Sequence, residues 1–353
     1  MRISHAEWPL QVDELCHALV VELGSADFNA DNVPSMPTLV SCCQGLITVD
    51  KEASTVRLIH FSLHEYLSSH PDIVDRPHSA VAEICLTYLN SRQIRAFSTA
   101  PSPDMENTCF LQYCSVYWGV HAKRELSDCP RSLALKLLLK EHYDLISTIL
   151  LLGHARLDLG DRDNCPPFSG LHCASFFGIV EVVATLIEAG CYDINKQGFW
   201  GCTPLSWAAY NGHEEVVEIL LRWRKVNPDK ADDDGQTPLF FAARNGHEGV
   251  VKMLRGRKEV NPGKPDNFGQ TPLSIAAESG HEGLVEIVLG REEVHPDKPD
   301  NTGRAALSHS ALKGHEGVVK ILLGWGGVNP DRPDKFGRTL LLYDSWNPIV
   351  VRV

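Results

Sequence analysis

One interval organises the second half of the chain. The tripeptide TPL begins at Thr203 and returns at Thr237 and Thr271, and the related tripeptides AAL and TLL begin at Ala305 and Thr339. Each step is 34 residues, and Gly-His pairs recur with the same interval. Self-similarity at a fixed period of this size is typical of stacked repeats, so each unit must adopt nearly the same structure.

Each 34-residue unit is predicted to form two helices joined by a turn and followed by an extended loop. Thr237 can cap the first helix with its hydroxyl, Pro238 suits the first helical position, and Gly246 can adopt the left-handed conformation that ends this helix. Val250 and Leu254 belong to an apolar stripe on the second helix. One unit cannot bury this stripe alone, so we expect a stacked solenoid of about five complete units, starting near residues 169, 203, 237, 271 and 305.

Two of these units, DDDGQTPLFFAARNGHEGVVKMLR and DNFGQTPLSIAAESGHEGLVEIVL, resemble ankyrin repeats, D-x-x-G-x-T-P-L-H-x-A-A-x-x-G-H. The resemblance covers about residues 169–345 and implies a mostly α-helical solenoid with short β-hairpin loops. The histidine that usually follows TPL survives only as His172. The unit at Ala305 lacks both the Thr cap and the Pro, so we expect it to be the loosest, and the segment from Thr339 has no second helix.

One histidine and one aspartate recur from repeat to repeat and form two ladders of potential metal ligands, but neither ladder predicts a metal site. Stacked helices lie ~8–10 Å apart, whereas a zinc ion needs nitrogens about 2 Å away, so we expect the histidines to brace turns through hydrogen bonds to local backbone. The aspartates fail as calcium loops, because Lys230 and Phe241 occupy the first and last ligand positions. The ladders are His213, His247, His281 and His315, and Asp232, Asp266, Asp300 and Asp334.

A third ladder varies between repeats and predicts a protein-binding surface. The hairpin tips carry aromatic residues, and the first helices present Tyr and Arg on the concave side. Exposed aromatic residues beside Arg are typical of interface anchors, although ordinary packing is the alternative. The candidate protein-binding residues are Phe199, Trp200, Tyr210, Arg244, Phe268 and Phe336.

The first 70 residues alternate helical and extended signals. Val12, Leu15, Leu19 and Leu23 fall on one helical face, and PTLVSCC is predicted to form a short helix closed by Gly45. GLITV and TVRLI flank a polar turn and predict a β-hairpin. Together with a following helix, these elements outline a truncated winged-helix domain, whose uncharged TLVSCC segment argues against DNA binding.

A helical bridge is expected between the two halves. HSAVAEICLTYL is amphipathic, FLQYCSVYWGVHAKRE is a second helix candidate, and helices at about 132–153 are expected to dock onto the first ankyrin unit. The expected domains are therefore a winged-helix-like remnant at 1–70, a helical bridge and N-terminal cap at 71–168, and ankyrin repeats at 169–353.

His60 and His64 have the spacing of two zinc ligands, but Ser62 and Glu65 form a capping box that starts a helix between them. The two rings then belong to different elements, and we expect no metal site. The segments EWPLQVDELCHAL, LVSCCQGLITVD and VRLIHFSLHEYL resemble the winged helix that follows the NACHT nucleotide-binding domain in NOD-like and fungal NACHT-ankyrin receptors of the STAND class. The resemblance implies the sensor or adaptor part of a signalling receptor in innate immunity or programmed cell death, with His60 contacting a nucleotide phosphate when a NACHT domain is present. A packed histidine is the alternative.

The chain contains no G-x-x-x-x-G-K-[ST] phosphate loop, so it cannot by itself bind ATP in that manner. We therefore expect a fragment of a larger receptor or a short paralogue. The alternative function is a regulatory chain that completes the nucleotide site of a separate NTPase in trans through His60.

Composition argues against several other functions. The net charge of -12 disfavours binding to nucleic acid and acidic membranes. Charged residues interrupt the most apolar stretch, so we expect no membrane-spanning helix. The eleven cysteines lack a C-x-x-C motif and are predicted to be reduced thiols of a cytoplasmic protein. Because no catalytic constellation is evident, we expect no enzymatic activity and no cofactor, and protein partners instead.

Overall fold

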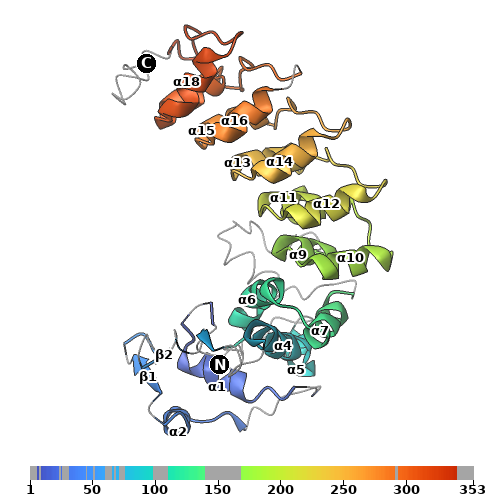
Figure 1. The fold of residues 1–353 in the computed structure, drawn as a ribbon, viewed down its shortest axis with the longest axis vertical. Coiled ribbons are helices and arrows are strands. Elements are labelled where there is room, and N and C mark those ends of the chain that lie inside the picture. The colour runs from blue at the N-terminus through green and yellow to red at the C-terminus, as the bar shows by residue number, and fades with distance from the viewer. Residues whose placement is uncertain are drawn as a thin grey trace. The chain divides into compact units, whose positions relative to one another are not determined.

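The computed structural model describes residues 6–7, 9–23, 25, 32–44, 46–50, 52–59, 66, 69–70, 76–97, 110–139, 168–290 and 293–339. Helices dominate these residues (Figure 1). The chain divides into two compact units, residues 1–191 and 192–353. The mostly helical fold class predicted from the repeats is confirmed.

The first unit begins with two short helices and a β-hairpin. Asp50 Oδ1 accepts hydrogen bonds from the backbone N–H groups of Glu52 and Ala53, both at 3.1 Å, and so shapes the turn. The strands pair antiparallel, with Ile47 opposite Leu58, which confirms the predicted hairpin. The elements are α1 (Val12–Leu19), α2 (Met36–Cys42), β1 (Ile47–Asp50) and β2 (Thr55–Leu58).

The predicted apolar face of α1 is only partly correct. Leu15 is buried, but Leu19 is 45% exposed and Leu23 is 52% exposed. Leu23 lies beyond the end of α1 at Leu19, so it does not belong to the helical face. The exposure of Leu19 shows that the buried face does not extend to the last residue of the helix. The short helix α2 is confirmed, whereas Gly45, predicted to close it, lies outside the described residues.

The described part of the bridge contains four helices. The predicted amphipathic helix α4 packs against both α6 and α7 and is buried on nearly every side, including Leu86. Tyr88 of α4 and Trp118 of α6 are among the largest fully buried side chains. The helices are α4 (Pro77–Asn90), α5 (Arg92–Phe97), α6 (Leu111–Arg124) and α7 (Asp128–Leu138).

The first predicted repeat belongs to the first compact unit. Its helices are α9 (Gly170–Phe177) and α10 (Val180–Glu188), and α7 packs against both. A Cβ atom on Gly170 would lie 2.1 Å from the carbonyl oxygen of Leu138, so only glycine allows α7 and α9 to approach so closely. This contact confirms that a bridge helix covers the first repeat, while residues 140–153 lie outside the described part of the chain.

In the second unit, the residues that the structure describes form a stack of four helix pairs (Figure 1). The first helices of successive pairs pack on one another, and so do the second helices. Together with α9 and α10, they confirm the five predicted helix pairs. The pairs are α11 (Pro204–Tyr210) and α12 (Glu214–Arg222), α13 (Pro238–Arg244) and α14 (Glu248–Arg255), α15 (Pro272–Glu278) and α16 (Glu282–Leu289), and α17 (Ala306–Lys313) and α18 (Glu316–Gly324).

The predicted helix-start and helix-stop residues act as expected. Thr237 Oγ1 accepts a hydrogen bond from the backbone N–H of Phe240 at 3.2 Å, and Thr203 and Thr271 cap their helices in the same way. Gly246 has a φ of 81° in the left-handed region. Ala305 provides no side-chain cap, as its sequence indicated.

The histidine ladder joins neighbouring repeats, so the prediction of bonds to local backbone is wrong for the three rings whose bonds the structure defines. In each case the ring reaches the C-terminal end of the first helix in the preceding repeat, where carbonyl groups lack helical partners. His247 Nε2 donates to Tyr210 O at 2.9 Å, His281 Nε2 to Arg244 O at 3.0 Å, and His315 Nε2 to Glu278 O at 2.9 Å.

The nine cysteines among the described residues are all free thiols. None of the helices in the described ranges combines the length and the apolar character that a bilayer crossing requires.

Candidate functional site

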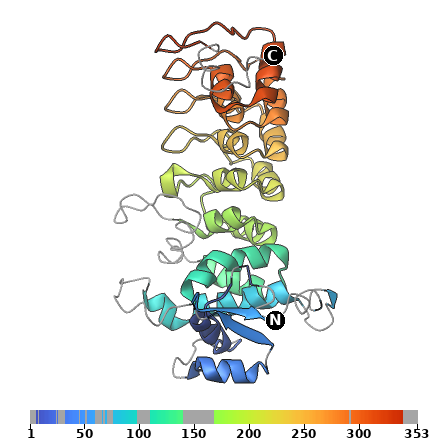
Figure 2. The same cartoon turned by 90° about the vertical axis from the view of Figure 1, so that its left-hand side faces the viewer.

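The hairpin tips of the second unit form a hydrogen-bonded ladder, and Figure 2 shows these loops projecting on the same side of the unit. Each tip donates a backbone N–H to a carbonyl of the preceding tip, at 2.8–3.0 Å. The ladder fixes the spacing of successive tips, so side chains on them are presented rigidly. The donor and acceptor pairs are Asp233 and Trp200, Asn267 and Asp234, Asn301 and Phe268, and Lys335 and Thr302.

The aspartate before each tip holds it in place. Asp266 Oδ1 accepts hydrogen bonds from the N–H groups of Phe268 and Gln270, at 2.9 and 2.8 Å. Asp334 Oδ1 accepts the equivalent bonds in its own loop, including one from Phe336 at 2.8 Å. Aspartate commonly stabilises tight turns in this way, so the aspartate ladder positions the tip residues.

Two of the six predicted protein-binding residues are large, exposed aromatic groups at these tips. Phe268 is 59% exposed and Phe336 is 71% exposed. Arg338 places its guanidinium carbon 4.8 Å from the centre of the Phe336 ring, and its Nε donates to Asp334 Oδ2 at 2.8 Å. Sequence analysis missed Arg338, although its position two residues after Phe336 in the same loop was a usable signal.

The expectation that Phe199 is exposed is wrong. Phe199 is only 3% exposed, whereas its neighbour Trp200 is partly exposed. Both lie in the short 3-10 turn η5 (Phe199–Gly201), where Trp200 adopts a φ of 53°. This left-handed residue lets the two rings meet edge to face at 5.0 Å, with Phe199 inside.

Tyr210 and Arg244 occupy the first helices but are partly buried. The Tyr210 ring lies 6.0 Å from Trp207 and 5.9 Å from Phe241, and Trp207 in turn lies 6.1 Å from Trp200. Two predicted residues, Trp200 and Tyr210, are therefore joined through the buried Trp207, which the sequence did not single out.

Arg244 packs on a buried aromatic residue of its own helix. Its guanidinium carbon lies 5.1 Å from the ring centre of Phe240, four residues earlier on the same helix. The pair of Arg and exposed aromatic residue that sequence analysis sought occurs instead in one loop, as Arg338 and Phe336.

Two aspartates at the same repeat position have pKa values shifted in opposite directions. Burial, reinforced by Asp234 and Asp233, raises the pKa of Asp232 to about 6 against the opposing effect of backbone hydrogen bonds. At Asp300 burial also acts to raise the pKa, but hydrogen bonds from Thr302 and the Arg304 backbone, with the nearby His309, lower it overall.

These shifts predict opposite effects of two matched substitutions. Asp232→Asn keeps an oxygen for the turn but removes a charge that is unfavourable above the folded pKa. We expect it to stabilise the chain by about 1 kcal/mol at pH 7, after allowance for solvent screening. In the wild type, protonation of Asp232 adds to stability as the pH falls from 6 to 4, and Asp232→Asn should lack this gain.

Asp300→Asn should instead destabilise the chain at pH 7. The stabilisation from the Asp300 carboxylate is present above its unfolded pKa and is lost as the pH falls through the lower folded value. Urea unfolding of both variants between pH 4 and pH 8 measures these effects. The same sign of change for both variants at pH 7 would contradict the interpretation.

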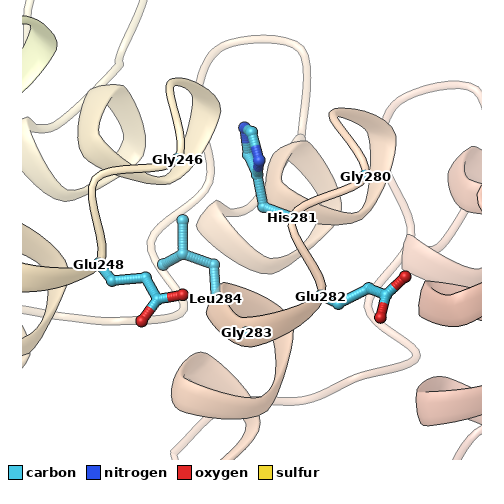
Figure 3. Close-up of a pocket in the computed structure, with 7 residues that line it drawn as sticks. All are labelled: Gly246, Glu248, Gly280, His281, Glu282, Gly283 and Leu284. Carbon is cyan, nitrogen blue, oxygen red and sulfur yellow. The ribbon is translucent and has the colours of Figure 1, made fainter.

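A separate hollow lies at the turns between paired helices (Figure 3), with a volume of about 290 Å³. Three of its seven lining residues are glycines. The side chain of Glu248 points toward Leu284, while that of Glu282 points away. A Cβ atom on Gly283 would lie only 2.5 Å from Glu248 Oε1, so a larger residue at this position would conflict with the Glu248 side chain. Because these features arise from the packing of one repeat on the next, we favour the tip ladder as the functional site.

Two known protein families match parts of the chain. The ankyrin family, described as ankyrin repeats in three copies, matches residues 128–221, 171–264 and 257–334, which together span more than half of the chain. The chain is an ankyrin-repeat protein. The first match begins at residue 128, where α7 also begins, so the family resemblance extends into the helix that covers the first repeat of the ankyrin solenoid.

The N-terminal part of this ankyrin-repeat protein matches a second family. Residues 1–80 match the winged helix domain of GPI inositol-deacylase, which supports the predicted winged-helix-like region. A search of the curated proteins found no match for the chain. His60, the predicted nucleotide contact, lies outside the described residues.

Proposed function

We propose that the chain is a non-catalytic, cytoplasmic recognition module whose tip ladder and first helices bind a partner protein. The observation that carries this proposal is the exposure of Phe268 and Phe336 on a hydrogen-bonded ladder of tips. An exposed ring held on rigid backbone loses little conformational entropy on binding, so its burial contributes directly to affinity.

The chemistry of the tips indicates the kind of partner. The tip at Asp233 and Asp234 is acidic, and both residues are exposed, whereas Phe268 and Phe336 offer apolar contacts on later tips. A partner with a basic group followed by two apolar pockets would complement this row. Interfaces of this kind depend on a few aromatic anchors, with the surrounding polar contacts contributing less.

A capture experiment with matched variants tests the binding face. The full chain is used to isolate a partner, and affinity is then measured for the double variant Phe268→Ala, Phe336→Ala. Because anchors of this type contribute 2 kcal/mol or more, we expect about a 30-fold or greater loss of affinity.

The control is the double variant Trp223→Ala, Trp325→Ala. It removes two aromatic side chains that are also exposed, each by 41%, but that lie outside the tips. We expect this control to bind as the wild type does. Equal binding by the tip variant, or loss confined to the control, would reject the assignment of the face.

The wider role that we propose is that of a sensor or adaptor in a NACHT-type signalling receptor. Its support is the combination of a winged-helix region with ankyrin repeats in one chain, together with the resemblance of the first segments to NACHT-associated winged helices. Co-purification of the chain with NACHT-domain proteins, in ADP and in ATP, tests this role. We expect nucleotide-dependent association, and its absence with every such protein of the source cell would count against the proposal.

A further inference from the structure

Three potential metal ligands meet in the first compact unit. Glu7 lies in the segment before α1, His78 is the second residue of α4, and His121 lies in the last turn of α6. One ligand atom from each residue lies within 4.8 Å of the other two. Packing of α4 on α6 creates this cluster, which no local spacing in the sequence indicates.

The two imidazoles face each other through equivalent nitrogens. His78 Nδ1 lies 2.9 Å from His121 Nδ1, so one of the two atoms must donate a proton and the other must accept it. His121 is fully buried, while His78 is partly exposed and gives the cluster access to solvent. Each Nδ1 atom can direct a lone pair at the space between the two rings. A metal ion can therefore take the place of the proton that the two nitrogens share.

A tyrosine contacts the second ring nitrogen of His121. Tyr113 Oη lies 2.9 Å from His121 Nε2 and accepts a hydrogen bond from the backbone N–H of Glu7 at 3.3 Å. When Nε2–H donates to Tyr113, the Nδ1 atom carries the lone pair toward His78. Metal-binding histidines generally donate their second N–H to such a partner, which orients the ring.

The third ligand is also anchored. Arg124 contacts both carboxylate oxygens of Glu7: Nη2 donates to Oε2 at 3.1 Å, and Nη1 donates to Oε1. Arg124 competes with a cation for this carboxylate. However, a carboxylate offers about four lone-pair positions, so Glu7 can keep one Arg124 contact while it binds a metal ion.

We propose that Glu7, His78 and His121 bind a divalent transition-metal ion of the zinc class. Two imidazoles and one carboxylate are a donor set that zinc accepts, with a further position open to solvent. Ligand atoms around a tetrahedral zinc ion lie about 3.4 Å apart, so the present cluster needs only small side-chain adjustments. The ion replaces the proton shared by the two Nδ1 atoms, and His78 then carries its proton on Nε2.

Such an ion would join three segments of the first unit. It would tie the N-terminal segment to α4 and α6, which are held together here by packing, by hydrogen bonds and by the Glu7–Arg124 pair. Because the ligand set requires the folded arrangement, binding of the ion stabilises the folded state by mass action.

Metal titration of the purified, chelator-treated full chain tests the site. Zinc binding is measured by calorimetry, and cobalt is used as a spectroscopic probe. We expect one saturable high-affinity site, a cobalt spectrum of tetrahedral type without sulfur-to-metal charge transfer, and a rise in the thermal midpoint of the first unit. His78→Gln and Glu7→Gln should each weaken binding about tenfold or more.

The matched controls are His70→Gln and Glu52→Gln, which alter exposed residues outside the cluster. Both controls should bind zinc as the wild type does, and circular dichroism should show that all four variants are folded. No saturable binding, or equal binding by all variants, would overturn the proposal. Sulfur-to-cobalt charge transfer would also overturn it, because it would assign the ion to exposed thiols such as Cys129.

Discussion

Replacement of Trp118 by alanine should lower the free energy of unfolding of the first unit by about 3–5 kcal/mol. Trp118 has no solvent exposure, and its ring meets Phe177 edge to face with centres 5.1 Å apart. Phe177 ends α9, the first helix of the first ankyrin repeat. The substitution removes buried apolar surface and leaves a cavity where the bridge supports the repeat.

The neighbouring glycine limits how far the site can relax. A Cβ on Gly119 would lie 2.1 Å from Phe177 Cγ, so α6 already approaches this ring as closely as its backbone allows. The cavity left by Trp118→Ala therefore cannot be filled by a simple shift of α6 toward α9.

Urea unfolding followed by far-UV circular dichroism measures the effect, with Trp223→Ala as the control. Trp223 is 41% exposed, and its removal should change stability by no more than about 1 kcal/mol. Similar losses for the two variants would contradict the proposed support of the first repeat by the bridge.

The features that sequence analysis predicted well are those set by local chemistry. The cap at Thr237 and the left-handed conformation at Gly246 depend on residues within one turn. The 34-residue periodicity repeats the cap at Thr203 and Thr271, although not at Ala305, and repeats the left-handed glycine in each of the five helix pairs. The β-hairpin also follows from a local signal, because Asp50 shapes its own turn.

The features that sequence analysis missed depend on contacts between elements. The carbonyl partner of His281 belongs to Arg244 in the preceding repeat, so no rule about its own turn could identify it. Phe199 is buried next to Trp200, which adopts a left-handed conformation that is uncommon for a bulky residue and that its sequence does not signal. His78 and His121 meet only because two helices of the bridge pack together.

Substitution of Gly280 by alanine should destabilise the second unit by about 2–4 kcal/mol. Gly280 has a φ of 78°, a conformation that costs a residue with a side chain about 1–2 kcal/mol. The added Cβ would also lie 2.6 Å from His315 Nδ1. The ring of His315 would have to move, with loss or distortion of its hydrogen bond to the Glu278 carbonyl.

A glycine in a different environment supplies the control. Gly324 is the last residue of α18, and a Cβ there would meet no atom within 4 Å. Gly324→Ala should therefore be neutral or stabilise the chain by about 0.4–1 kcal/mol, because it restricts the unfolded state.

A double-mutant cycle separates backbone strain from the contact between repeats. In the His315→Ala background the steric conflict is absent, so Gly280→Ala should cost about 1 kcal/mol less than it does in the wild type. Urea unfolding of the four proteins gives this coupling energy directly. If the two substitutions are additive, the Gly280 and His315 contact does not limit the packing of successive repeats, and the histidine ladder contributes only its hydrogen bonds.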